Sequence, residues 1–96
     1  MILAAATAAM VSFWGPYFPP PEFDHPFRGD LFVEWATGDE IWNYCPSFGV
    51  ACVIRKTPTE CLVFINLDYI IYKDRILRHE IGHCNGWPSN HPNPQQ

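Results

Sequence analysis

The stretch from Gly49 to Leu67, GVACVIRKTPTECLVFINL, decides the fold of this chain. Residues 49–56 and residues 61–67 are both rich in branched and aromatic side chains, which favour β-strands. Between them stand only four turn-like residues, Thr57-Pro58-Thr59-Glu60. Because so short a connection is typical of strands that run in opposite directions, the sequence predicts an antiparallel hairpin.

One further strand and one helix are predicted around this hairpin. Residues 31–35, LFVEW, alternate and end at the turn signal Thr37-Gly38-Asp39. A helix follows the hairpin; it begins at Asn66, Asp68 or Asp74 and ends near Cys84, before Gly86 and Pro88. Its periodicity turns Leu77, Ile81 and Cys84 to the core, sets Ile76, His79 and His83 on the neighbouring stripe, and directs Arg75, Arg78 and Gly82 away. We therefore expect an α+β domain, with a small antiparallel sheet of about three strands packed on a C-terminal helix.

Composition limits the classes of function. The chain has 96 residues, of which 48% are hydrophobic, so it forms at most one small domain with a core. Its net charge of −4 argues against a nucleic-acid partner, which would require a basic face. No stretch approaches the roughly 18 apolar residues of a transmembrane helix. A compact cluster of side chains must therefore carry any chemistry.

The chain divides into three segments. Residues 1–13 are apolar and form an N-terminal helix or a signal-like segment, although no basic residue precedes Arg28. Residues 14–29 are rich in proline and aromatic residues and form a strap that lays Phe18, Phe23 and Phe27 across the domain. Residues 30–96 form a metal-binding domain. Within it, the aromatic residues Trp35, Trp42 and Tyr44 are expected to help fill the core, or else to line a substrate groove.

Four cysteines, Cys45, Cys52, Cys61 and Cys84, allow three pairings, which spacing alone does not distinguish. The turn-like residues after Cys45 favour a local bridge to Cys52, which leaves Cys61 to pair with Cys84 and tie a strand to the last helix. Buried free thiols in a cytoplasmic protein are the alternative. Since disulfides form in oxidising compartments, an exported or periplasmic location is favoured over a cytoplasmic one.

The sequence His79-Glu80-Ile81-Gly82-His83 carries the chemistry. Two histidines four residues apart on a helix project from one face and can hold one Zn²⁺. Glu80 lies beside that face, where it can accept a proton from a zinc-bound water. The alternative interpretation is two surface histidines on an ordinary helix.

The residues HEIGHCNGWPSNH, from His79 to His91, resemble the active-site helix of zincin metallopeptidases, and Gly86 fits the metzincin pattern HExxHxxGxxH. A looser resemblance links them to small bacterial zincin-like proteins. The resemblance implies zinc on His79 and His83, Glu80 as the base of peptide-bond hydrolysis, a small twisted sheet packed on the helix, and a peptide or protein substrate extended along an edge strand. In a chain this small, a partner protein or a second copy is expected to complete the substrate groove.

The third ligand departs from the metzincin pattern, which would place it at Ser89 and add a Met-turn that this sequence lacks. No acidic residue follows Glu80, so His91 is the expected ligand downstream of His83. His25, Cys84, Asp68 and Asp74 remain alternatives. Tyr72, and less so Tyr69, is a candidate to stabilise the oxyanion, although packing is the more common role of such a tyrosine. We expect a zinc-dependent hydrolase. The alternatives are a non-catalytic module that zinc stabilises and, third, an interaction protein that disulfides stabilise.

Overall fold

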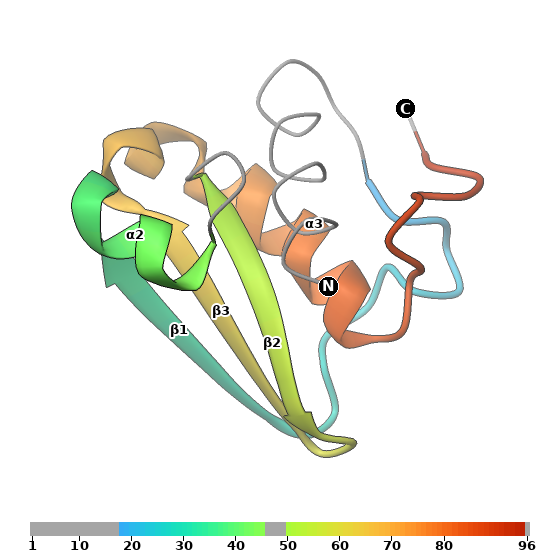
Figure 1. The fold of residues 1–96 in the computed structure, drawn as a ribbon. Helices are drawn as coiled ribbons and strands as arrows, with labels where there is room; N and C mark the ends of the chain where they lie inside the picture. The colour runs from blue at the N-terminus through green and yellow to red at the C-terminus, as the bar shows by residue number, and fades with distance from the viewer. Residues whose placement is uncertain (1–17, 46–49, 96) are drawn as a thin grey trace.

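A computed structural model describes residues 18–45 and 50–95 of the chain (Figure 1). Its elements, in order, are β1 (Asp30–Ala36), α2 (Gly38–Tyr44), β2 (Ala51–Thr57), β3 (Glu60–Asn66), the 3₁₀ helix η1 (Leu67–Tyr72) and α3 (Lys73–Cys84). These elements confirm the α+β class, with three strands and a C-terminal helix. The predicted N-terminal segment, residues 1–13, lies outside the described residues, as do residues 14–17 of the predicted strap.

The sheet has the strand order β1-β3-β2. β2 and β3 form the predicted antiparallel hairpin, in which Val53 faces Val63. β1, however, runs parallel to β3, with Val33 opposite Val63, so the sheet is mixed rather than wholly antiparallel. The physical reason is that β3 carries apolar residues on both faces, from Cys61 to Ile65, and such a strand is best buried in the centre. β3 therefore inserts between β1 and β2.

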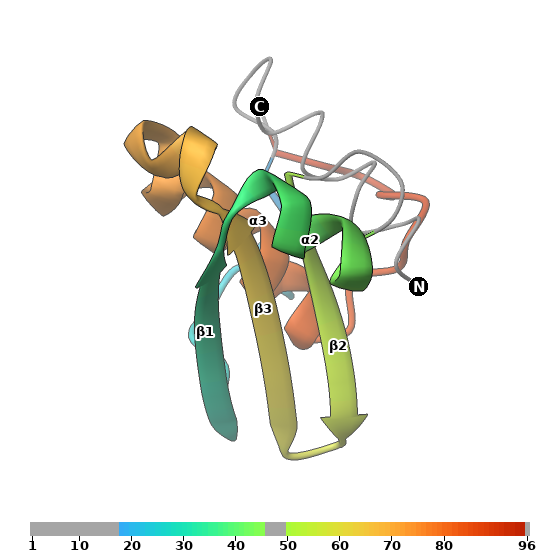
Figure 2. The same cartoon turned by 60° about the vertical axis from the view of Figure 1, so that its left-hand side comes forward.

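Helix α2 occupies the segment for which the sequence predicted only a turn. Thr37 caps it: its side chain accepts a hydrogen bond from the Glu40 backbone N–H, and the Glu40 carboxylate accepts one from the Thr37 N–H. This capping box starts a helix that crosses one end of the sheet (Figure 2). Ile41 is its buried residue and packs with Phe64 in a cluster on that face.

Helix α3 covers the opposite face of the sheet, over β2 and β3 (Figures 1 and 2). Ile76 and Cys84 are fully buried and join Val63 and Ile65 in the main core cluster, against which Leu77 packs at its edge. Two expected orientations are wrong. Ile81 is only half-buried, and Gly82, expected to face away, is buried.

Both expected disulfides are present, Cys45–Cys52 and Cys61–Cys84, so all four cysteines are bonded. The first joins the end of α2 to β2. The second joins the start of β3 to the last residue of α3, next to His83. The alternative of free thiols is therefore wrong, and each end of the sheet is tied covalently to a helix.

The described part of the strap, residues 18–29, runs along α3 and meets the segment that follows it, residues 85–95, here called the C-terminal arm. Asp24 pairs with Arg78 on α3 at 2.5 Å and also accepts a hydrogen bond from Gln95 on the arm. Gln95 in turn forms a backbone bridge with Phe18. The strap therefore ties the arm to the helix. Of the aromatic residues expected to lie across the domain, Phe27 packs on the main core cluster.

Three aromatic residues differ from the core that the sequence predicted. Trp35, Trp42 and Tyr44 are 40%, 51% and 42% exposed. Trp35 lies near the end of β1, whereas Trp42 and Tyr44 lie in α2, and the described residues leave all three partly open to solvent. Tyr44 nevertheless stacks on Phe64, with ring centres 4.2 Å apart. None of the described helices combines the length and apolar character needed to cross a membrane.

Candidate metal centre

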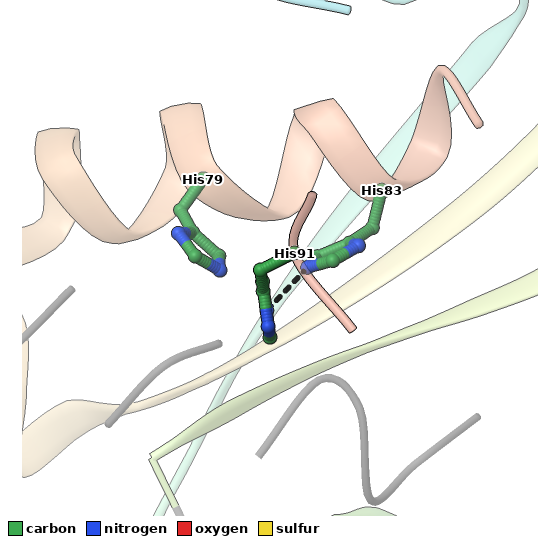
Figure 3. A group of neighbouring side chains, drawn as sticks. All are labelled: His79, His83 and His91. Atoms are coloured by element: carbon green, nitrogen blue, oxygen red, sulfur yellow. Dashed lines mark hydrogen bonds between the residues drawn. The ribbon is translucent and has the colours of Figure 1, made fainter. Parts of the chain in front are cut away.

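His79 and His83 occupy successive turns of α3 and project from one side of the helix (Figure 3). The spacing of four residues places them on the same face, as the sequence predicted. His79 is fully buried, and its ring centre lies 5.1 Å from that of His83. The packing of α3 on the sheet therefore holds both rings in place at the inner side of the helix.

The C-terminal arm brings His91 to these two rings (Figure 3). Gly86 ends the helix with φ +108°, a conformation that favours glycine, and the chain turns back so that the Trp87 N–H donates to the Gly82 carbonyl. His91 itself adopts φ +55° and is 94% buried. A left-handed backbone at a non-glycine residue costs about 1–3 kcal/mol and persists where the surroundings enforce it, often at functional positions.

The three imidazoles form a nearly equilateral triangle. Their ring centres lie 5.1 Å apart for His79 and His83, 5.2 Å for His79 and His91, and 5.0 Å for His83 and His91. The Nε2 atoms of His83 and His91 are 3.2 Å apart, and one nitrogen from each ring falls in a group within 4.8 Å. Tetrahedral bonds of about 2.0–2.1 Å to one zinc ion would space the bonded nitrogens by about 3.3 Å. The donor set can therefore hold a metal ion; for zinc, the widest separation between the nitrogens would have to contract from up to 4.8 Å to about 3.3 Å.

Hydrogen bonding and burial prepare these rings to act as ligands. Nδ1 of His83 lies 2.8 Å from the carbonyl oxygen of Trp87, which fixes the proton on Nδ1 and leaves the lone pair on Nε2. Burial lowers the pKa of His83, and burial together with the nearby His83 lowers the pKa of His91 to about 4. Both rings are therefore neutral at pH 7, the form that binds metal.

Glu80 lies between the two helical histidines in sequence and is fully buried. Neither of its carboxylate oxygens has a hydrogen-bond partner within residues 18–45 and 50–95. Burial raises the pKa of Glu80 well above the ordinary value, because the ionised form loses its solvation. A buried carboxyl group without a hydrogen-bond partner is costly, so a cation or a polar group beside Glu80 would stabilise it.

The alternative third ligands lie elsewhere or are chemically committed. Cys84 is in a disulfide, and Asp68 and Asp74 are exposed. His25 bonds to the Pro26 carbonyl oxygen through Nδ1, at the rim of a different cavity. Within the described ranges, the group of metal-binding side chains consists of His79, His83 and His91. Tyr72 is half-buried against the main core cluster, with Tyr69 beside it, and its proposed role at the oxyanion stays a prediction.

Sequence reasoning missed the residues that hold the arm in place. Asp24, Arg78 and Gln95 meet although 54 and 71 positions separate Asp24 from the other two, and no spacing pattern marks such a contact. The close packing of the strap on α3 at Gly82, in contrast, could have been predicted. A Cβ atom there would lie 2.6 Å from Pro19, so the glycine within the histidine motif indicates close packing against the helix.

Comparisons of this chain with protein-family models, with curated proteins and with solved structures found no match.

Proposed function

We propose that this chain is a zinc-dependent hydrolase, and specifically a small metallopeptidase. His79, His83 and His91 would hold Zn²⁺, and Glu80 would serve as the general base. The observation that carries the proposal is the convergence of three imidazoles, two of them buried and that of His83 partly buried, next in sequence to a buried glutamate whose oxygens have no partner among the described residues. A merely structural histidine cluster gives no reason for that glutamate.

The donor set supports a catalytic ion over a structural one. Structural zinc sites take four protein ligands, commonly with thiolates, whereas catalytic sites take three and keep one position open. All four cysteines of this chain are in disulfides and cannot supply thiolate. Within the described residues three imidazoles converge, and three neutral ligands leave the full charge of the ion available to polarise a substrate.

The chain's own residues then divide the work of hydrolysis. A zinc ion at this position would lower the pKa of water to about 7 and polarise a carbonyl group. The charge of the ion would also favour ionised Glu80, against the effect of burial, so that this carboxylate can take the proton of the attacking water. After attack, Glu80 can return that proton to the leaving amine.

A peptide is the substrate that the fold suits. β2 is an edge strand, and α3 lies over β2 and β3, so the edge of the sheet runs beside the helix that carries the histidines. Edge strands bind extended peptides through backbone hydrogen bonds. A partner protein or a second copy completing the groove remains part of the proposal. The two disulfides fit an oxidising compartment, and we propose an exported or periplasmic location.

A peptide-library digest with zinc-loaded protein tests this function. Wild type should cleave peptides, and Glu80→Gln, which keeps the shape of the side chain, should retain zinc but lose at least about 100-fold in cleavage rate. Glu34→Gln, at an exposed position of β1, is the control and should cleave like wild type. No cleavage by wild type, or full cleavage by Glu80→Gln, would refute the proposed hydrolase.

A further inference from the structure

Trp87 lies against all three histidines of the candidate metal centre. Its ring centre is 5.1 Å from that of His79, 4.9 Å from that of His83 and 5.0 Å from that of His91. It stacks on His83, with 17° between the ring planes, and meets the other two at steep angles. The indole is 98% buried. It therefore forms one wall of the centre and limits the rotation of each ring.

The polar groups of Trp87 bind both segments that supply the histidines. Its carbonyl oxygen accepts a hydrogen bond from Nδ1 of His83, on the helix. Its indole Nε1–H donates at 2.9 Å to the carbonyl oxygen of Pro92, the residue after His91 on the arm. Since His91 has a left-handed backbone, the bond beside it helps to hold a conformation that the residue would not adopt by itself.

We propose that Trp87 is the positioning residue of the metal centre: its main-chain carbonyl sets the tautomer of His83, and its indole fixes the arm so that His91 faces the two helical ligands. This inference rests on the proposed metal centre but not on hydrolysis. Groups that orient metal ligands without touching the metal typically contribute 10–100-fold to affinity. Packing alone would make Trp87 important for stability and leave the affinity of the folded protein for zinc unchanged.

The test measures the Kd of the full chain for Zn²⁺ by competition with a chelator of known affinity. Trp87→Phe retains a ring but loses the bond to the Pro92 carbonyl, so its affinity for zinc should fall roughly 10–100-fold. The absorption bands of its Co²⁺ form should also shift, because the ligand geometry changes. Trp42→Phe, on α2 and 51% exposed, is the matched control and should equal wild type. Equal affinity and identical Co²⁺ spectra for Trp87→Phe and wild type would overturn the inference.

A second measurement on the wild-type chain covers the case in which Trp87→Phe does not fold. If the Trp87 bond favours the arrangement that binds metal, metal must in return favour the bond. Zinc should therefore slow hydrogen exchange of the Trp87 indole N–H, followed by nitrogen-15 NMR, and leave that of Trp42 unchanged. Zinc binding without such protection would overturn the positioning role alone. A wild-type chain that binds no zinc would instead refute the metal centre.

Discussion

The Nε2 atom of His83 on α3 lies 3.2 Å from the Nε2 atom of His91 on the C-terminal arm. This separation matches the edge of a tetrahedron around a zinc ion. The contact also brings a helix together with an irregular segment. The strap, the Cys61–Cys84 disulfide and the close packing at Gly82 help to hold α3 and the arm in place. Each of these features can be tested separately.

Replacing His91 should abolish tight zinc binding while sparing the fold. His91→Asn is the variant to use, since asparagine tolerates the left-handed backbone that His91 adopts. Loss of a direct ligand should weaken the Kd for zinc by more than about 100-fold, because loss of an orienting group alone costs 10–100-fold. His25→Asn is the control, as His25 lies outside the histidine group. Equal affinity of wild type and His91→Asn, by isothermal titration calorimetry, would exclude His91 as a ligand.

Asp24 should make the stability of the strap depend on pH. The hydrogen bond from Arg78 holds the pKa of Asp24 below its usual value of 3.8. A depressed carboxyl pKa stabilises the folded state above the unfolded-state value, and the contribution is lost as the pH falls through the folded-state value. Arg78 is half exposed, so we expect Asp24→Asn to cost only about 1 kcal/mol at pH 7.

Urea unfolding of wild type and Asp24→Asn at several pH values checks this. The difference between them should shrink to zero as the pH falls below 3.8. Glu22→Gln changes an exposed acid of the same strap and should stay within about 0.5 kcal/mol of wild type throughout. A difference between wild type and Asp24→Asn that is independent of pH would contradict the ion pair.

The two disulfides should differ in their effect on stability and on metal binding. The Cys61–Cys84 bridge closes a separation of 23 residues and the Cys45–Cys52 bridge one of 7. Loop-closure entropy then predicts losses of about 3 kcal/mol and about 2 kcal/mol when each pair is replaced by alanine. Because Cys84 follows His83, only the replacement of Cys61 and Cys84 should also weaken zinc binding. Denaturant unfolding and zinc titration of both double variants test this, and equal weakening of zinc binding in the two would contradict it.

Replacing Gly82 by alanine should lower the stability of the protein, whereas replacing Gly38 by alanine should raise it. A Cβ atom at Gly82 would lie 2.6 and 2.7 Å from atoms of the Pro19 ring, so the strap must move, at a cost of about 1–3 kcal/mol. The gain in helix propensity, about 1 kcal/mol, does not offset the upper part of that range. At Gly38 the nearest atom is 3.6 Å away, so alanine fits there and should stabilise α2. Thermal unfolding of both variants decides, and a stabilised Gly82→Ala would show that Pro19 does not press on the helix.

The sequence predicted the hairpin and the last helix because local patterns determine them, and it favoured both disulfides because a local Cys45–Cys52 bridge leaves Cys61 for Cys84. β-Branched runs on either side of a short turn define the hairpin, although Thr57 and Glu60 pair and the turn is shorter than the four residues expected; Gly86 marks where α3 ends. Helix α2 was missed because Thr37-Gly38-Asp39 resembles a turn, although Thr37 and Glu40 form a capping box that could have revealed it. The parallel pairing of β1 depends on which strand occupies the centre of the sheet, a choice made by burial on both faces rather than by any local signal.

The histidines of the candidate site could be predicted from the sequence, whereas their surroundings could not. His79 and His83 follow from helix geometry, and His91 from the absence of other ligands downstream, and the structure brings these three together. The full burial of Glu80 and the contacts of Trp87 with three rings depend on how the arm folds back, which no periodicity encodes. The exposure of Trp42 likewise depends on how α2 packs on the sheet, which no local pattern predicts.

X-ray absorption at the zinc edge of the zinc-loaded full chain tests the metal centre most directly. Three imidazole nitrogens and one oxygen at about 2.0–2.1 Å, with no sulfur, are expected, and His91→Asn should lose one imidazole from the shell. A sulfur neighbour at about 2.3 Å, an unchanged shell in His91→Asn, or a wild-type chain that retains no zinc would contradict a centre built from His79, His83 and His91.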